Sequence, residues 1–478
     1  MPGGRGKSPV PGSRVVPAEE AVLPTLRTAV VGAGISGLTL AWALRSRGVP
    51  VVVLESEMRV GGQIRSWLDD GFVLEAGPNG FLDRDGAVAR VAEQLGIAGL
   101  LRPASPAADR RAVFVRGRVR LLPTKPPQLL GSNVLPWWAK LRLLLEPLSR
   151  RGPAGVDESL AHFGRRHFGR HVTETLLDAV QTGIFAGDSE RLSVRAAFPR
   201  LHHMERSHRS LLLAAKAMRR TSPGGPVRLG SFEGGLETLP RALGAALGEA
   251  VRLGARVRSL EPAGGGWRVG WEGGAEQFDR VVLALPPRIS AELLRPLDAS
   301  IATALEAIHS VPVSVVHLGW RPALEPDPEG FGVLVPAREK RRVLGVIFAS
   351  SAYPFRAPGG GTLLTTLVGG AHGAAFAALP DKELLALVRE ELRGILGVER
   401  PPDLVRIVRW SHAIPQYEVG HHGRLDAIAA ALRRQPGLVL AGNALRGPGI
   451  ADCVRESLAL ADSIVPTAVG RGAPSSAA

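Results

Sequence analysis

The chain has 478 residues, of which 45% are hydrophobic and 22% charged, both near the averages for soluble globular proteins. These values exclude a small disulfide-stapled scaffold, a disordered chain and a polytopic membrane protein, and at roughly 100–200 residues per domain they predict about two to four domains. The single cysteine, Cys453, cannot form an internal disulfide, and no Cys/His cluster has zinc-ligand spacing, so no metal site is expected.

The chain carries 59 basic and 44 acidic residues, a formal net charge of +15, and only six of the basic residues are lysines. Two interpretations stay open at this point: arginines spread over solvated faces by a GC-rich genome, or an anionic partner such as a membrane surface or a carboxylate-rich substrate. Aromatic residues make up 5%, and no RNP-like or helix-turn-helix pattern is present, which argues against nucleic acid as a partner.

Residues 1–27 are rich in Pro, Gly and Arg and contain no apolar signal core, so we expect a disordered extension rather than a secretory signal. The longest uncharged stretch, Thr28–Leu44, is at the lower limit for crossing a bilayer and contains three glycines, so a soluble structure explains it better.

The segment that begins at Thr28 has the pattern of a dinucleotide-binding unit. A buried strand over Thr28–Val31 is predicted to lead through GAGISG (residues 32–37) into an apolar helix, and a second strand over Val51–Leu54 ends at Glu55. G-x-G-x-x-G between a strand and a helix, with an acid about 20 residues further on, lets backbone amides approach a pyrophosphate while the acid accepts the ribose hydroxyls.

This fingerprint alone does not separate NAD from FAD. A second glycine pair follows at Gly61 and Gly62, and EAGPNG occupies residues 75–80. Near the other end, a strand over Leu438–Leu440 leads through AGNALRGPGIADC (residues 441–453) into a helix that is predicted to reach Ile464. A distant strand-to-helix turn of this kind fits a long cofactor, because its helix N-terminus can face the pyrimidine end of a flavin.

Several stretches in one order resemble the flavin-containing amine oxidase superfamily, and within it the oxygen-dependent protoporphyrinogen oxidases. They include GPNGFL (77–82), QTGIFAGDSERLS (181–193), FEGGLETLP (232–240), GFGVLVP (330–336) and AIPQYEVGH (413–421). The resemblance covers about residues 28–465 and implies noncovalent FAD. It assigns cofactor contacts to Gly32, Ala33, Gly34, Ile35, Ser36, Gly37, Glu55, Ser56, Arg59, Gly61, Gly62, Gln63, Gly77, Pro78, Asn79, Gly80, Val257 (at the adenine), Trp410, Asn443, Pro448, Gly449 and Ile450.

The fold class that follows is a multi-domain α/β (α+β) protein. A discontinuous, Rossmann-like FAD-binding domain is expected at residues 28–95, 225–290 and 405–466. A helical membrane-associating insert is expected at residues 96–224 and a mixed-sheet substrate domain at residues 291–404. A flexible tail is expected at residues 467–478. Local patterns also predict strands over 256–260, 267–271 and 281–285.

Within the insert, residues 135–145 (LPWWAKLRLLL) combine tryptophans, aliphatic residues and cations. Such a helix fits a membrane interface, and it fits an ordinary core helix about equally well. The resemblance favours the interface, because members of the family are commonly peripheral or monotopic membrane proteins.

The resemblance also suggests how substrate is held. Arg111 is the expected propionate clamp, ahead of Arg110, because a guanidinium binds a carboxylate bidentately. Gly183 is expected to face the pyrrole N–H groups through its carbonyl, while Leu334, Ile347 and Leu367 form apolar walls. Leu367 stands where relatives have phenylalanine or methionine, and Ala186 replaces a glycine common in plant relatives.

The function implied is oxidation of protoporphyrinogen IX to protoporphyrin IX, with O2 as acceptor and H2O2 as product. The porphyrinogen's pyrroles activate its own meso C–H bonds, so positioning over FAD suffices and no catalytic side chain or metal is assigned. Three alternatives stay open: coproporphyrinogen III oxidation, an amine oxidase or desaturase on the same fold, and a flavin-stabilised membrane scaffold. Histidines 309, 317, 412, 421 and 422 receive no role.

The expected location is the cytoplasmic face of the cytoplasmic membrane. A homodimer and transfer of product to ferrochelatase are left open, and no nucleic-acid partner is expected.

Overall fold

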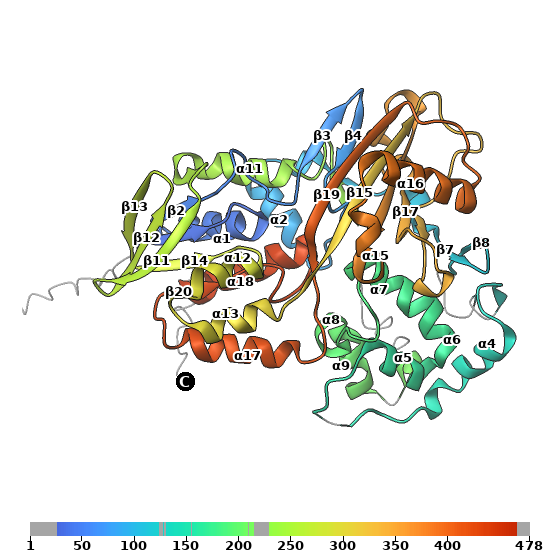
Figure 1. Cartoon of the computed structure of the whole chain (residues 1–478), viewed down its shortest axis with the longest axis horizontal. Helices are drawn as coiled ribbons and strands as arrows, with labels where there is room; N and C mark the ends of the chain where they lie inside the picture. Colours follow the sequence, from blue (N-terminus) through green and yellow to red (C-terminus); the bar gives the residue numbers. More distant parts are fainter. Residues whose placement is uncertain are drawn as a thin grey trace, which may run out of the picture.

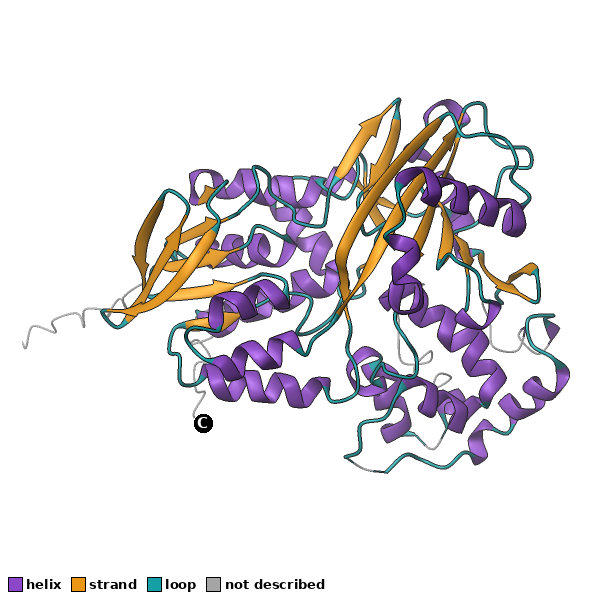
Figure 2. Ribbon diagram, viewed as in Figure 1, coloured by secondary structure: helices purple, strands orange, loops and turns teal. Residues whose placement is uncertain are grey.

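The structure, a computed structural model, describes residues 26–123, 128, 131–153, 155–208, 210–214 and 229–465. Figure 1 shows three parts: at the left the part that is expected to bind the cofactor, which we call the cofactor side, then a long twisted sheet around β15 (Ser310–Trp320) and β19 (Leu404–Pro415), and a group of helices below this sheet. Figure 2 shows that the strands are concentrated in the first two parts and the lower group is almost wholly helical.

A five-stranded parallel sheet forms the base of the cofactor side, in the order β10-β2-β1-β14-β20. Its strands are short, Val- and Leu-rich runs. They are β1 (Thr28–Val31), β2 (Val51–Leu54), β10 (Val251–Arg252), β14 (Arg280–Leu283) and β20 (Leu438–Leu440). β1, β2 and the buried part of β14 have no exposed face, as expected for a parallel sheet covered on both sides. The predicted strands at residues 28–31, 51–54 and 438–440 are therefore confirmed.

The two faces of this sheet carry different layers. One face packs Val30 and Val53 against four helices: α1 (Ile35–Ser46), α2 (Ala87–Gln94), α11 (Thr238–Leu247) and α18 (Ile450–Ile464). The other face packs Val31 and Leu283 against three helices and a three-stranded antiparallel sheet. These are α12 (Pro287–Leu294), α13 (Ala299–Glu306), α17 (His421–Leu432), β11 (Val257–Ala263), β12 (Gly266–Trp271) and β13 (Gly274–Phe278).

The second large sheet has seven strands in the order β19-β15-β18-β17-β16-β7-β8. Its remaining strands are β7 (Arg111–Val115), β8 (Arg118–Leu121), β16 (Gly332–Leu334), β17 (Gly345–Phe348) and β18 (Thr362–Gly369). It is mixed, because β16 and β7 run parallel while the other pairs are antiparallel. One face packs Val316, Val333 and Val346 against α16 (Asp381–Leu396), which leaves the opposite face to line the site.

Smaller elements complete the two sheet-bearing parts. β3 (Ser66–Asp69) and β4 (Phe72–Glu75) form a hairpin, and β5 (Phe81–Leu82), β9 (Leu229–Phe232) and β6 (Leu101–Pro103) form a short three-stranded sheet. Short helices α14 (Ala349–Ala352) and α15 (Gly370–Ala377) follow β17 and β18.

The helical part contains α4 (Trp137–Leu144), α5 (Leu160–Phe168), α6 (Arg170–Val172), α7 (Asp178–Phe185), α8 (Val194–Ala197) and α9 (Pro199–Ser207). A π-helical turn, Thr173–Leu177, joins α6 to α7. The described residues contain no helix with both the length and the apolar character needed to cross a membrane.

The structure moves several domain boundaries that the sequence suggested. Residues 101–121 form β6, β7 and β8, so the helical insert begins after them rather than at residue 96. β19 joins the seven-stranded sheet, which moves the start of the last cofactor segment from residue 405 to beyond Pro415. α12 and α13 pack on the parallel sheet, so residues 291–306 leave the substrate domain. Local sequence patterns missed these boundaries, because contacts between segments far apart in the sequence determine which part each element joins.

The disordered extension expected over residues 1–27 does not include Arg27. Arg27 lies in the folded part, where its backbone N–H donates to Asp279 Oδ2 over 2.7 Å and its guanidinium pairs with Glu276. Residues 1–25 of the expected extension, and the whole of the expected tail at 467–478, lie outside the described residues.

Candidate functional site

Four loops are expected to contact the cofactor, and we call them cofactor loops on that expectation. The first cofactor loop, residues 32–37, is shaped by its three glycines. Gly32 has a φ of +104°, a conformation that L side chains rarely adopt. A β-carbon at Gly37 would lie 2.0 Å from the carbonyl oxygen of Gly32, so only glycine lets α1 start this close to β1. A β-carbon at Gly34 would instead point into open space, with no atom of the described residues within 4 Å.

The start of α1 therefore presents backbone amides to an open side. Gly34 is the N-cap and has no side-chain cap, Ile35 and Ser36 form the first turn, and no acidic residue neutralises that turn. A helix N-terminus of this kind carries partial positive charge and binds phosphate groups. The turn fits the pyrophosphate of a dinucleotide.

Glu55 lies directly beyond β2 and is almost fully buried against this loop. Its Oε2 accepts from the backbone N–H of Ala33 over 2.7 Å, while its Oε1 accepts from Glu57 N over 2.9 Å and from Ser56 Oγ over 3.1 Å. A carboxylate oxygen has two lone pairs, so Glu55 keeps the capacity to accept a ribose hydroxyl as well. Val257, at the start of β11, is close by, because Ala255 N donates to the carbonyl of Glu55 over 2.7 Å.

The second cofactor loop, residues 59–63, lies against the first. Gly61 N donates to Ala33 O over 2.8 Å, and a β-carbon at Gly62 would lie 3.3 Å from Gly34 Cα. Arg59 braces the loop from within by donating to Val60 O and Gly62 O. Gln63 reaches across to β19, where its Nε2 donates to the carbonyls of residues 412 and 413. The loop thus connects the parallel sheet to the seven-stranded sheet.

The third cofactor loop, residues 75–80, is held by its carbonyl oxygens. Trp410 of β19 donates from Nε1 to Ala76 O over 2.8 Å, and a β-carbon at Gly77 would lie 3.9 Å from the same nitrogen. Asn79 Nδ2 donates back to Gly77 O over 3.2 Å, across Pro78. A β-carbon at Gly80 would meet Tyr353 Oη at 2.3 Å, so a larger residue here would displace the Tyr353 side chain.

Sequence reasoning missed a buried charge cluster behind this loop. We call it the junction cluster: Glu75, Asn79, His317 and Arg356. Arg356 Nη2 pairs with Glu75 Oε1 over 3.1 Å and donates to Asn79 O over 2.8 Å. Burial lowers the pKa of Arg356 and raises the pKa of Glu75, and the ion pair offsets part of both shifts.

His317 of β15 completes the junction cluster as a neutral donor. Burial lowers its pKa to about 4, so the ring is uncharged near neutral pH. Its Nε2 lies 2.9 Å from Glu75 O, which assigns the ring proton to Nε2, and its Nδ1 accepts from Thr365 Oγ1 over 3.0 Å. One signal of this cluster was present in the sequence, the carboxylate of Glu75 at the end of a hydrophobic run. Arg356 ends a short 3-10 turn, Pro354–Arg356, and had none.

The fourth cofactor loop, residues 441–450, leads into α18. Gly449 is the N-cap of α18 and its N–H donates to Asp452 Oδ2 over 3.3 Å, while Pro448 precedes it and Ile450 begins the helix. Asn443 lies at the start of the loop, and its carbonyl accepts from the hydroxyl of Tyr417. Burial raises the pKa of Cys453 to about 11, so this residue is a neutral thiol.

The expected apolar walls share one face of the seven-stranded sheet. Along β16, β17 and β18 the neighbours of Leu334, Ile347 and Leu367 point into the core beneath α16, so by strand alternation these three point to the opposite face. Gly183 of α7 covers this face, because a β-carbon there would lie 3.1 Å from Leu334 Cδ2. The structure therefore brings all four residues together.

The two candidate clamp residues differ in their partners. Arg110 donates to Glu329, which occupies its guanidinium. Arg111, the exposed first residue of β7, forms no ion pair with any described residue and lies over the Phe331 ring at 5.7 Å. Gly332 is its register partner on β16, two residues from Leu334. This geometry favours Arg111 as the group that is free to take a carboxylate.

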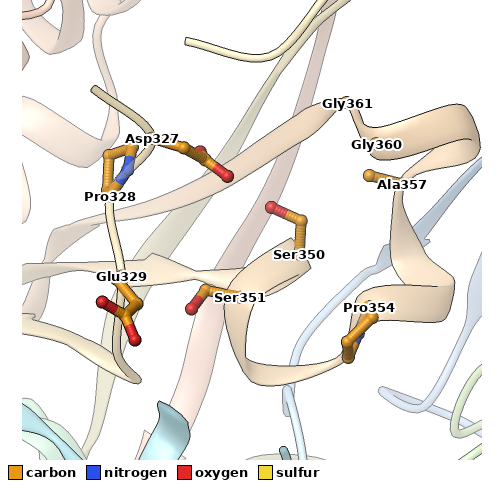
Figure 3. Close-up of a pocket in the computed structure, with 9 residues that line it drawn as sticks. All are labelled: Asp327, Pro328, Glu329, Ser350, Ser351, Pro354, Ala357, Gly360 and Gly361. Carbon is orange, nitrogen blue, oxygen red and sulfur yellow. The ribbon is translucent and has the colours of Figure 1, made fainter. Parts of the chain in front are cut away.

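The cavity drawn in Figure 3 is separate from these residues. It has a volume of about 340 Å³ and is lined by Asp327, Pro328, Glu329, Ser350, Ser351, Pro354, Ala357, Gly360 and Gly361. Its hydroxyls already have partners: Ser350 Oγ accepts from Leu363 N, and Ser351 Oγ accepts from Gly330 N. None of the residues expected to bind cofactor or substrate lines it.

Comparison with known proteins identifies the family of the chain. Residues 35–465 match the family model described as flavin containing amine oxidoreductase. A protoporphyrinogen oxidase of Bos taurus is 34% identical over 92% of this chain and 99% of its own length. A coproporphyrinogen III oxidase of Bacillus subtilis is 28% identical over 90% of this chain and 96% of its own. A solved structure of a candidate protoporphyrinogen oxidase from Exiguobacterium is 26% identical, with a TM-score of 0.81 over 92% of this chain and 98% of that one.

Proposed function

Because the chain belongs to the flavin-containing amine oxidoreductase family, in its porphyrinogen oxidase branch, we propose that it oxidises protoporphyrinogen IX to protoporphyrin IX. It is a flavin-dependent enzyme of tetrapyrrole biosynthesis, and FAD is its cofactor. The observation that carries the proposal is the apolar face of Leu334, Ile347 and Leu367, which lies under Gly183 and has Arg111 free at its edge.

The chemistry needs little from side chains. Bound FAD would supply the redox chemistry, taking two electrons from the porphyrinogen per round and reducing one O2 to H2O2, so three rounds would consume three O2 and give three H2O2 per porphyrin. The chain binds and orients: Leu334 and Leu367 exclude water from the macrocycle, the Gly183 carbonyl accepts a pyrrole N–H, and Arg111 holds a propionate at the edge.

Coproporphyrinogen III is the rival substrate, and the 28% identity to the Bacillus subtilis enzyme keeps it in view. It carries four propionates instead of two, so it needs more cations around the site. Supplying both porphyrinogens in competition and separating the fluorescent porphyrins decides between them. Protoporphyrin in excess supports the proposal, and coproporphyrin in excess reassigns the substrate.

Arg111→Ala tests the substrate model itself. Charge-assisted hydrogen bonds contribute roughly 1.5–3 kcal/mol, so KM is expected to rise about ten- to a hundredfold while flavin reduction at saturation changes little. Arg111→Lys keeps the charge without the planar fork and should lie between. Arg110→Ala is the matched control, because that guanidinium is already paired with Glu329. A KM raised by the control alone would move the clamp to Arg110.

Release of the flavin by acid tests the mode of binding. The buried, neutral thiol of Cys453 gives no activated nucleophile for a covalent link, so FAD should be released on acid precipitation. Flavin that stays in the pellet would contradict this. A colourless purified protein would favour a scaffold, and turnover of amines or carotenoids without porphyrinogen turnover would favour another activity of the fold.

We further propose that α4 contacts the cytoplasmic membrane surface. Ala139 is the one buried residue of α4, so this is not a core helix, and Trp137 and Trp138 are 75% and 50% exposed. Lys140 and Arg142 add cations beside them, a composition that suits an anionic interface. In Figure 1 the helix lies at the outer edge of the helical part.

The membrane proposal is tested by sedimentation with anionic vesicles. Trp137→Glu with Trp138→Glu should move the protein to the supernatant with its melting temperature unchanged. Leu68→Glu is a matched control, since Leu68 is also 75% exposed but lies in the β3–β4 hairpin. Equal sedimentation of all three proteins would exclude α4 as the contact.

A further inference from the structure

Tyr417 and His421 form a stacked pair beside the fourth cofactor loop. Their ring centroids are 4.4 Å apart and their planes differ by 16°. Both side chains are about 2% exposed, and both come from the connector, residues 416–421, that follows β19 and starts α17. The sequence singled out this stretch only as part of a family-like segment and gave His421 no role.

Each ring donates one hydrogen bond to a carbonyl of the loop. The Tyr417 hydroxyl donates to Asn443 O, and His421 Nε2 lies 3.3 Å from Leu445 O. Burial lowers the pKa of His421 to about 4, so the ring is neutral, and the contact with a carbonyl places its one proton on Nε2. Burial likewise raises the pKa of Tyr417, so its hydroxyl stays a donor.

Around these two carbonyls the loop is held by Ala441 N, which donates to Leu283 O over 2.9 Å, and by Ala444, which is buried in the hydrophobic core. Gly442 has a φ of +121°, and Leu445 N makes a long 3.2 Å bond back to Gly442 O. Five residues after Asn443, Pro448 and Gly449 begin the turn into α18. Each of the two carbonyls lies in a planar peptide unit with the N–H group of the next residue, which points the opposite way. By fixing the carbonyls of Asn443 and Leu445, the connector therefore also sets the direction of the amides that follow them.

The connector itself is anchored on the helical insert. Ser193 N donates to Tyr417 O over 2.8 Å, and Gly420 N donates to Asp157 Oδ2 over 2.8 Å. Phe185, the last residue of α7, packs on the Tyr417 ring with centroids 5.4 Å apart. The stacked pair thus has a fixed base from which to hold the loop.

We propose that Tyr417 and His421 are positioning residues for the flavin: by holding the carbonyls of Asn443 and Leu445, they aim the amides of the fourth cofactor loop at FAD. This rests on the FAD-dependent function above and on the loop being a cofactor contact. It does not depend on which porphyrinogen is oxidised.

Tyr417→Phe removes one hydroxyl and keeps the stacked ring. One hydrogen bond of ordinary strength corresponds to a rise of about five- to tenfold in the dissociation constant of FAD, measured by titrating the flavin-free protein. The flavin midpoint potential should become more negative, because fewer aligned donors stabilise the reduced ring. His421→Phe, which keeps an aromatic ring but loses the donor, should shift both quantities in the same direction.

Ser314→Ala is the matched control. Its hydroxyl is also buried and donates to a backbone carbonyl, Ala377 O, over 2.7 Å, on the side of the seven-stranded sheet away from the loop. It should lower the melting temperature without changing FAD affinity or potential. If Tyr417→Phe and His421→Phe behave like this control, the pair is merely structural and the proposal is overturned. The competition assay with the two porphyrinogens tests the substrate and not the flavin, so its outcome does not change the interpretation of the FAD affinities and potentials.

Discussion

Two buried charge clusters hold this molecule together in different ways. The junction cluster has one cation, one anion and a neutral histidine, and its Arg356 donates from Nη2 to Glu75 and to the carbonyl of Asn79 and from Nη1 to Asn79 Oδ1. The insert cluster, which we define as Glu146, Arg166, His167 and Glu205, has a histidine between two carboxylates: its Nδ1 lies 3.1 Å from Glu146 Oε1 and its Nε2 lies 3.0 Å from Glu205 Oε1.

The difference shows what each cluster is for. The junction cluster shapes the third cofactor loop, and the charges of Arg356 and Glu75 balance each other within the cluster. The insert cluster ties three segments of the helical part together, because Glu146 also accepts from Leu211 N over 2.9 Å and Glu205 accepts from Gly152 N over 3.0 Å. The insert cluster therefore holds two carboxylates around His167, with Arg166 paired to Glu205, whereas the junction cluster holds a single carboxylate.

The largest expected effect comes from Arg356→Met. It leaves Glu75 buried without a counter-charge, which typically destabilises by about 3–5 kcal/mol, and it frees the Asn79 carbonyl, so FAD should be lost as well. Urea unfolding and the flavin content of the purified protein measure the two effects. Glu75→Gln in the same chain should restore part of the stability.

Arg434→Met is the control for this substitution. Arg434 pairs with Asp298, but its side chain is 60% exposed, so the loss should stay below about 1 kcal/mol. If Arg356→Met is no worse than Arg434→Met, the junction cluster contributes nothing beyond an ordinary surface pair.

His167→Gln should have a smaller and more local effect. Both carboxylates keep other donors, so the expected loss is about 1.5–3 kcal/mol, the range for hydrogen bonds to charged groups. Hydrogen exchange should rise in α5 and α9 while flavin content stays at the wild-type level. Loss of FAD from this variant would show that the two clusters act as one unit.

Lowering the pH should separate the two clusters. The pKa of His317 is held near 4 by burial, below its ordinary value of about 6.5, so the unfolded chain binds the extra proton and stability falls as pH drops through this window, by up to about 1.4 kcal/mol per pH unit. His421, with a pKa of about 4, contributes in the same direction.

The insert cluster should respond only at lower pH. Burial alone would raise the pKa of Glu205, but hydrogen bonds from Gly152 N, Arg166 and His167 lower it to about 2. Its contribution is complete above its unfolded value of about 4.5 and is lost as pH falls from there towards 2. Urea unfolding at several pH values measures both effects. The loss of unfolding free energy as pH falls from about 6.5 to about 4 should be smaller in His317→Asn than in the wild type. An unchanged slope would mean that His317 does not titrate on unfolding.

The sequence predicted the cofactor side well because its signals are local. Glycines 32, 34 and 37 and the acid at residue 55 lie within one strand-turn-helix-strand unit, and the structure forms that unit as expected. Neither charge cluster was predictable, since Glu75 and Arg356 are 281 residues apart and meet only when the seven-stranded sheet assembles. The same cause hid β7, β8 and β19 from local patterns, because their partners are distant strands.

The smallest expected effect comes from Ala186, which lies where the helical part contacts α15. Ala186 follows the last residue of α7 and has a φ of +47°, a left-handed conformation that glycine adopts more readily than alanine. Its carbonyl accepts from Ala371 N over 2.8 Å, which joins the helical part to α15 and holds the residue in this conformation. Ala186→Gly relieves the strain but adds freedom to the unfolded chain, so we expect a net stabilisation of at most about 1 kcal/mol. Thermal unfolding measures this, with Ala371→Gly as a control that should destabilise. A lower melting temperature for Ala186→Gly would mean that the added entropy of the unfolded chain outweighs the backbone strain at residue 186.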